Sequence, residues 1–170
     1  MNDRPFFDTN VILYAFRQGD ARAQVAETLL AAGGALSVQV LNEFVAVARR
    51  KLDKSWEEVR RALDILRVFC PEPAPLTVET HKRAVHISER YRYSIFDSLI
   101  IAAALHAGAG TLYSEDMQDG QVIDGLTIRN PFSRKAMQWG RLSTCRPIAN
   151  RPPDVVGALP TKTIRKRRGT

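Results

Sequence analysis

The sequence predicts an α/β fold with a mostly parallel central sheet. Short apolar segments at residues 6–7, 111–113 and 126–128 have the length of strands, and longer segments between them show the 3.6-residue spacing of helices. Polar residues follow directly where the apolar segments stop, as strand-to-helix turns require. Short strands that alternate with helices are typical of βα units, which build parallel sheets.

The first strand runs into Asp8-Thr9-Asn10 and would place a carboxylate at its end. Open α/β sheets bind their ligands at that edge. The alternative is that Asp8 or Thr9 only caps the following helix, as these residue types often do. Helices are predicted at residues 11–17 and 21–32, the second ending at Gly33-Gly34, with a short strand or turn at 35–38.

Two further helices follow in the middle of the chain. The helix at about residues 39–51 carries Glu43 at the rim of its apolar face, from where an acid can reach into a cleft. Ser55 and Glu58 have the spacing of a capping box and begin the next helix, which ends before Pro71. The predicted core positions of these two helices are Leu41, Phe44, Val45, Ala48 and Leu52, then Trp56, Val59, Leu63 and Leu66.

The remaining elements lead to two more acids. A helix at residues 78–91, capped by Thr77, offers Ala84, Val85 and Ser88 for packing. The helix at 94–105 is apolar almost all round, which indicates a buried helix, and Asp97 lies in its first turn. The strand at 111–113 stops at Ser114-Glu115-Asp116, and a closing strand or hairpin around Asp124-Gly125 finishes at residues 130–132.

Length and composition indicate one soluble domain. At 170 residues the chain can bury a sizeable core. The longest uninterrupted apolar run, residues 99–105, is far shorter than the roughly 20 residues that span a bilayer, and the N-terminus lacks a secretory pattern. The two cysteines match neither a metal clip nor a disulfide framework. We therefore expect a cytoplasmic protein without a membrane partner.

Basic charge is concentrated at the C-terminus. Residues 133–170 hold ten Lys and Arg against one acid, so the rest of the chain has a net charge of −2 within the total of +7. Four prolines and the loss of apolar periodicity predict a disordered tail. We therefore divide the chain into a domain at 1–132 and a basic tail at 133–170, which either contacts RNA phosphates or is simply solvated.

The four acids Asp8, Glu43, Asp97 and Asp116 are predicted to share one neighbourhood. Each also has a plain structural alternative as a cap, a turn residue or a surface acid. Asp97 is the hardest to explain in that way, because a charge at the edge of a core is costly unless a partner such as a divalent cation compensates it. Mg²⁺ and Mn²⁺ prefer oxygen ligands, and two such ions can cleave a phosphodiester without a His or Lys base.

In order and spacing, these residues resemble the acidic motifs of the PIN-domain nucleases. The likeness covers residue 4 to about residue 132, and it is nearest to the VapC-type toxins of bacterial toxin–antitoxin pairs. Its motifs are Phe6-Phe7-Asp8-Thr9-Asn10, Asn42-Glu43-Phe44, Phe96-Asp97-Ser98-Leu99-Ile100, the segment 112–120 and the closing Asn130-Pro131-Phe132. The basic extension departs from the family pattern.

The resemblance implies a three-layer α/β/α sandwich and an endoribonuclease that depends on Mg²⁺ or Mn²⁺. Asp8, Glu43, Asp97 and Asp116 would be its metal-binding acids. Asn10 and Ser114 would support them, as would Asp119 unless it is only a turn residue before Gly120. The family also implies an RNA substrate, a homodimer and an antitoxin that blocks the acidic cleft.

RNA needs positive charge near an acidic site. The candidates for RNA contact are Arg49, Arg50, Lys51 and Lys54, at the end of the helix that carries Glu43, and Arg90 and Arg92, ahead of Asp97. The alternative for all six is a solvated surface.

Two other functions compete with the nuclease. A phosphotransfer enzyme with an aspartyl nucleophile would also place an Asp after the first strand, but the residue two positions after Asp8 is Asn10 rather than a second Asp. A catalytically silent PIN-fold module that binds RNA or protein would be expected to have lost at least one of the acids, and all four are present.

Overall fold

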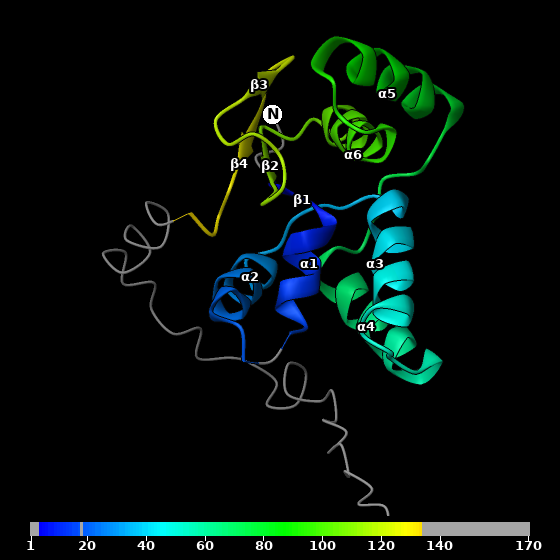
Figure 1. The fold of residues 1–170 in the computed structure, drawn as a ribbon, viewed down its shortest axis with the longest axis vertical. Coiled ribbons are helices and arrows are strands. Elements are labelled where there is room, and N and C mark those ends of the chain that lie inside the picture. The colour runs from blue at the N-terminus through cyan, green and yellow to red at the C-terminus, as the bar shows by residue number, and fades with distance from the viewer. Residues whose placement is uncertain (1–3, 18, 134–170) are drawn as a thin grey trace, which may run out of the picture.

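The computed structural model describes residues 4–17 and 19–133, and Figure 1 shows their arrangement. The four-stranded sheet has the order β1-β2-β4-β3. Strands β1 (Phe6–Phe7), β2 (Thr111–Tyr113) and β4 (Leu126–Arg129) run parallel, and β3 (Val122–Ile123) pairs antiparallel with β4. The predicted α/β class with a mostly parallel sheet is therefore confirmed. Apart from Ser133, the predicted basic tail lies outside the described residues.

The described residues contain six helices. They are α1 (Thr9–Ala15), α2 (Ala21–Ala31), α3 (Val38–Arg50), α4 (Trp56–Phe69), α5 (Val78–Tyr91) and α6 (Ile95–His106). Helix α1 follows β1 directly and packs against α2 and α3, whereas α5 packs against α6, which also contacts α3 (Figure 1). Within the described residues, no helix is both long and apolar enough to cross a membrane.

The predicted helices agree with the structure except near some of their ends. Helix α1 begins at Thr9 rather than at residue 11, because Asp8 already caps it. The capping box of Ser55 and Glu58 and the Thr77 cap are both present. Gly33 follows α2 with a φ of 84°, a backbone conformation that glycine adopts without strain. In the predicted strand or turn at 35–38, Ala35 and Ser37 form isolated β-bridges, and Val38 already begins α3.

Helix α6 supplies the centre of the hydrophobic core. All seven residues from Ser98 to Ala104 are buried, as its apolar sequence predicts. Phe6 and Phe7 from β1 and Leu112 from β2 are completely buried in the same core cluster. Asp8 and Ser114 follow these strands directly, so their side chains start from a rigid, close-packed support.

Three predicted packing positions are wrong. Trp56 is 55% exposed, because it is the first residue of α4 and stacks beside the guanidinium of Arg49 instead of entering the core. Leu52 is exposed because it lies beyond the end of α3. Val85 on α5 is also exposed, while Ala84 and Ile87 of the same helix are buried. Helical spacing predicts which side of a helix is apolar, but it does not show which residues on that side are covered by another element.

Candidate active site

Asp8 lies at the centre of the candidate site and is 5% exposed. It caps α1, and its Oδ1 accepts a hydrogen bond of 2.6 Å from the backbone N–H of Thr9. Its Oδ2 accepts a hydrogen bond from the Ser114 hydroxyl at 2.6 Å and another from the Asn10 amide at 2.9 Å. Asp8 is therefore a helix cap, as the structural alternative proposed, and it also meets side chains from across the sheet.

The strand register brings Asp8 and Ser114 together. Strands β1 and β2 are parallel, with Phe7 opposite Tyr113, so the next residue of each strand emerges at the same edge of the sheet. The backbone N–H of Asp8 donates to the Tyr113 carbonyl at 3.0 Å and extends this pairing by one step. Two residues that are 106 positions apart thereby come within hydrogen-bonding distance.

Burial and nearby negative charge disfavour the ionised form of Asp8. The pKa of the Asp8 carboxyl is raised from 3.8 to about 7, and burial is the largest cause. The charges of Asp97 and Glu43 also contribute to raising this pKa, whereas the hydrogen bonds from Ser114 and Thr9 lower it. The structure thus brings Glu43 and Asp97 close enough to Asp8 for their charges to act on it.

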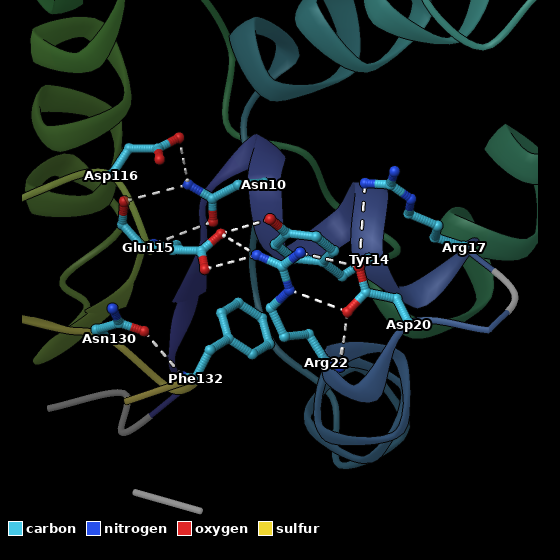
Figure 2. Close-up of polar contacts among 10 residues, drawn as sticks. Asn10, Tyr14, Arg17, Asp20, Arg22, Glu115, Asp116, Asn130 and Phe132 are labelled. Atoms are coloured by element: carbon cyan, nitrogen blue, oxygen red, sulfur yellow. Dashed lines mark hydrogen bonds and ion pairs between the residues drawn. The ribbon is translucent and has the colours of Figure 1, made fainter. Parts of the chain in front are cut away.

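Asn10 connects Asp8 to Asp116, and Figure 2 shows its contact with Asp116. The Asn10 side-chain amide donates to Asp8 at 2.9 Å and to Asp116 Oδ2 at 3.2 Å, and it lies 3.4 Å from the Ser114 hydroxyl. Asp116 itself is exposed. One amide therefore links a buried carboxylate to a carboxylate at the surface.

Glu43 is fixed by two hydrogen bonds. The Thr9 hydroxyl donates to its Oε2 at 2.8 Å, and the Gln39 side-chain amide donates to its Oε1 at 2.7 Å. Thr9 is the residue next to Asp8, so the first bond ties α3 to the start of α1. Glu43 is half-buried at the edge of α3, as its position at the rim of the apolar face predicts.

Asp97 lies in the first turn of α6 but does not cap it. The cap is Ser94, whose hydroxyl accepts from the backbone N–H of Asp97 at 3.1 Å and donates to Asp97 Oδ2 at 2.8 Å. Asp97 is half-buried, and the residues after it enter the core. The other carboxylate oxygen, Oδ1, accepts no hydrogen bond within the described residues.

The four acids do not form a compact ligand cage. In the described ranges, no three Asp, Glu, His or Cys side chains lie close enough together to hold a metal ion. The candidate ligand atoms of the four acids are nevertheless all carboxylate oxygens, which suit Mg²⁺ or Mn²⁺. Mg²⁺ is commonly held by one or two carboxylates, with water completing its shell. A cation would also offset the like charges that act on Asp8. The donor set therefore fits such an ion.

Asp119 contacts the closing segment of the chain. Its carboxylate accepts from the backbone N–H of Asn130 at 2.9 Å, and Asn130 in turn accepts from the backbone N–H of Phe132 at 2.8 Å. These bonds hold the closing segment of the chain. These contacts agree with the alternative of a turn residue for Asp119.

Several of the basic residues proposed for RNA contact have internal partners. The Arg49 guanidinium lies over Trp56 and donates to the Lys54 carbonyl, and Lys54 forms an ion pair with Glu58 at 3.3 Å. Arg90 lies over the ring of Tyr91. Arg50, Lys51 and Arg92 are exposed, and Arg92 ends α5 with a φ of 63°.

The comparison with protein families decides the classification. The family model of the PIN domain matches residues 6–118, a segment that contains Asp8, Glu43, Asp97 and Asp116. The chain belongs to the PIN-domain family. The family predicted from the acidic motifs is thereby confirmed.

Solved structures share the fold of this PIN domain. A toxin–antitoxin complex from Klebsiella pneumoniae is similar at 21% identity with a TM-score of 0.56, covering 72% of this chain and 95% of that one. VapC20 of Mycobacterium tuberculosis, a toxin that cleaves the sarcin–ricin loop, is similar at 23% identity with a TM-score of 0.54, covering 66% and 91%.

VapBC2 of Rickettsia felis, solved with a DNA fragment from its promoter, is similar at 22% identity with a TM-score of 0.55, covering 74% of this chain and 97% of that one. At these identities the likeness shows the fold alone, and it confirms the predicted VapC-like fold. No curated protein matches this PIN domain.

Sequence reasoning missed the residues that hold the acids in place. Thr9 and Gln39 fix Glu43, and Glu115 donates its backbone N–H to Asn10 at 3.2 Å. Thr9 and Glu115 each adjoin a predicted site acid, which is a usable signal. Gln39 lies one helical turn before Glu43, and a hydrogen bond at that spacing can be anticipated from the sequence.

Proposed function

We propose that this PIN-domain protein is an endoribonuclease that hydrolyses RNA phosphodiesters with Mg²⁺ or Mn²⁺ and acts as the toxin of a toxin–antitoxin pair. The observation that carries the proposal is the arrangement around Asp8. Asn10 joins Asp8 to Asp116, and the charges of Glu43 and Asp97 act on the same buried carboxylate. Membership of the PIN family and the shared fold of VapC20 support it.

Asp8, Glu43, Asp97 and Asp116 would hold the metal, either directly or through its bound waters, and bound Mg²⁺ or Mn²⁺ would supply water activation and stabilisation of the leaving oxygen. Asn10 and Ser114 orient Asp8 by donating to its Oδ2. Thr9 and Gln39 keep both oxygens of Glu43 engaged, so this carboxylate has a fixed direction. Preorganised oxygens lose little freedom when a charged group approaches them.

The surface cations serve this function unequally. Arg50, Lys51 and Arg92 are exposed and have no ion pair within the described residues, so we propose them as the RNA-phosphate contacts. Arg49, Lys54 and Arg90 have internal partners, and RNA binding would have to compete with those contacts. Asp119 has a structural role in this proposal.

The proposed protein partners are an antitoxin and a second copy of the chain. Two of the structures with this fold are toxin–antitoxin complexes. An apolar groove of about 190 Å³ lies between α3 and α4, and its lining includes Leu41, Val45 and Leu63. Light scattering of the full chain tests the homodimer, which has twice the 19.0 kDa mass of one chain.

The function is tested by cleavage of a mixed pool of structured RNA. The purified full chain is incubated with Mg²⁺, with Mn²⁺ and with EDTA, and Asp97→Asn is measured in parallel. The variant keeps the size of the side chain and its acceptor for Ser94, so the fold should survive. Loss of one charge from the site should slow cleavage on the order of a hundredfold.

Asp64→Asn is the matched control. Asp64 is an exposed acid on α4, paired with Arg67 at 3.4 Å, and it receives the same chemical change away from Asp8. It should cleave RNA like the parent. If Asp97→Asn cut RNA as fast as Asp64→Asn, the site assignment would be wrong. Metal binding by the parent without any RNA cleavage would favour the silent binding module instead.

A further inference from the structure

Arg22 connects three elements beside the acids (Figure 2). Its Nη1 donates to the two carboxylate oxygens of Glu115 at 2.9 and 3.2 Å. Its Nε and Nη2 donate to the two oxygens of Asp20 at 3.0 and 2.9 Å. These hydrogen bonds hold the pKa of the Asp20 carboxyl down at about 2. A single guanidinium therefore joins the start of α2 to the segment after β2.

Tyr14 on α1 completes this arrangement. Its ring lies under the Arg22 guanidinium, 4.0 Å from the ring centroid, and its hydroxyl donates to Glu115 Oε2 at 2.5 Å. Phe132, the last residue of the closing motif, meets the same ring edge-on at a centroid distance of 5.0 Å. We call Tyr14, Asp20, Arg22 and Glu115 the arginine clamp.

The arginine clamp reaches the acids through the backbone of Glu115. The N–H of Glu115 donates to Asn10 Oδ1 at 3.2 Å. This bond occupies the oxygen of the Asn10 side chain, so the NH₂ group must point the other way, toward Asp8 and Asp116. Without it, a rotation of the amide by 180° would turn the Asn10 oxygen toward two carboxylates.

We infer that Arg22 is a positioning residue for the acid site. It anchors the Glu115 side chain so that the Glu115 backbone sets the orientation of Asn10, and Asn10 in turn holds Asp8 and Asp116 in one arrangement. Arg22 touches none of the four acids and acts only through Glu115 and Asn10. This inference deepens the proposed nuclease function and rests on it for its effect on cleavage.

The clamp also neutralises a neighbouring charge. Glu115 lies next to Asp116 in the chain and is partly exposed, with a side-chain exposure of 25%. Released from Arg22, its carboxylate would add a fifth negative group beside the site and compete for the Asn10 amide. Lys cannot replace Arg fully, because only the planar guanidinium binds two carboxylates in a fork and stacks on a ring at once.

Arg17 provides a matched control for Arg22. It is also an arginine near Asp20, but it is 56% exposed and makes one long contact of 4.0 Å with that residue. Arg17→Gln removes the same charge as Arg22→Gln and leaves the contacts to Tyr14 and Glu115 intact. Both variants are prepared in the full chain, together with Arg22→Lys and Glu115→Gln.

The first measurement reports on Asn10 without cleavage. The side-chain amide of Asn10 is observed by NMR in ¹⁵N-labelled, metal-free protein and assigned by its loss in Asn10→Ala. Its proton shifts should be the same in the parent and Arg17→Gln. In Arg22→Gln and Glu115→Gln they should move toward the values of a solvent-exposed Asn, while backbone resonances of α5 and α6 stay in place.

The second measurement is the Mg²⁺ concentration that gives half-maximal RNA cleavage. Loss of a group that orients a metal-binding side chain typically costs 10-fold to 100-fold in affinity or activity, so Arg22→Gln should need roughly ten times more Mg²⁺. The KM for RNA should not change. Arg22→Lys should fall between Arg22→Gln and the parent, and combining Arg22→Gln with Glu115→Gln should add little.

The two measurements separate the inference from the proposed function. If the parent did not cleave RNA, the nuclease proposal would fail, and the Asn10 resonances would still decide whether Arg22 positions that residue. Unchanged Asn10 shifts in a folded Arg22→Gln would overturn the inference. If Arg22→Gln did not fold, Arg22→Lys and Glu115→Gln would be held to the same two criteria.

Discussion

Replacing Asp8 by asparagine tests whether the buried carboxylate costs the metal-free protein stability. The pKa of Asp8 rises from 3.8 to about 7 on folding, mainly because of burial. At 1.36 kcal/mol per pKa unit, the full cost of ionising Asp8 in the folded state is about 4 kcal/mol. The asparagine side chain carries no charge and should remove most of this cost.

The sign of the pH dependence follows from proton binding. Between about pH 4 and pH 7 the folded protein keeps a proton on Asp8 that the unfolded chain has lost. The free energy of unfolding therefore falls as the pH rises through this window, and the whole cost is present above pH 7. In Asp8→Asn this contribution to the pH dependence should be absent.

The net gain of Asp8→Asn should be smaller than the full cost. Ser114 and Asn10 both donate to Oδ2 of Asp8, and an amide NH₂ at that position cannot accept from them. The loss of these hydrogen bonds should destabilise the variant by about 2 kcal/mol. We therefore expect the variant to be more stable than the parent by about 2 kcal/mol at pH 8 and less stable than the parent at pH 4.

Urea unfolding in EDTA at pH 4 to 8 measures both effects, with Asp64→Asn as the control for a change of exposed charge. Adding Mg²⁺ at pH 8 should stabilise the parent more than Asp8→Asn, because only the parent gains a partner for the charge on Asp8. The reasoning is refuted if the difference in stability between Asp8→Asn and the parent does not change between pH 4 and pH 8.

Two further predictions concern the core. The Ser98 hydroxyl is fully buried without a hydrogen-bond partner in the described residues. Ser98→Ala should therefore raise the free energy of unfolding by about 1 kcal/mol. The control Ser88→Ala loses a 2.8 Å hydrogen bond to a backbone carbonyl and should lower the free energy of unfolding by about 1 kcal/mol. A thermal melt in which Ser98→Ala lost stability as Ser88→Ala does would contradict this. A Cβ on Gly34 would lie 2.3 Å from Cε2 of Phe7 and 2.8 Å from a backbone carbonyl oxygen, so Gly34→Ala should lower the free energy of unfolding by roughly 2 kcal/mol. Gly110 has open space around it, so the control Gly110→Ala should change this free energy by under about 0.5 kcal/mol. Urea unfolding measures both variants.

Local features of this fold could be predicted well from the sequence. The capping box at Ser55, the Thr77 cap and the glycine after α2 depend on a few adjacent residues, and each is present. The burial of α6 follows from its almost continuous apolar composition. The misplacement of Trp56 shows the limit of this reasoning, because an apolar residue at a helix end is buried only if another element covers it.

The candidate site also has a part that the sequence predicted and a part that it did not. The acids Asp8, Glu43, Asp97 and Asp116 could be selected from the sequence, because together they follow the order and spacing of the PIN motifs, although each alone has a plain structural alternative. The residues that hold these acids in place could not be found from the sequence in the same way, because several of their contacts join distant positions. The bond from Thr9 to Glu43 joins residues 34 positions apart, and the ion pair from Arg22 to Glu115 joins residues 93 positions apart.

The sequence by itself determined which segments form helices and strands, where they are capped and which acids belong to the PIN pattern, since these depend on neighbouring residues and on composition. Only the tertiary structure decided that Phe7 pairs with Tyr113 and thereby brings Ser114 to Asp8. It also decided that Arg22 reaches Glu115. Such contacts depend on strand register and helix packing, which are properties of the whole folded core.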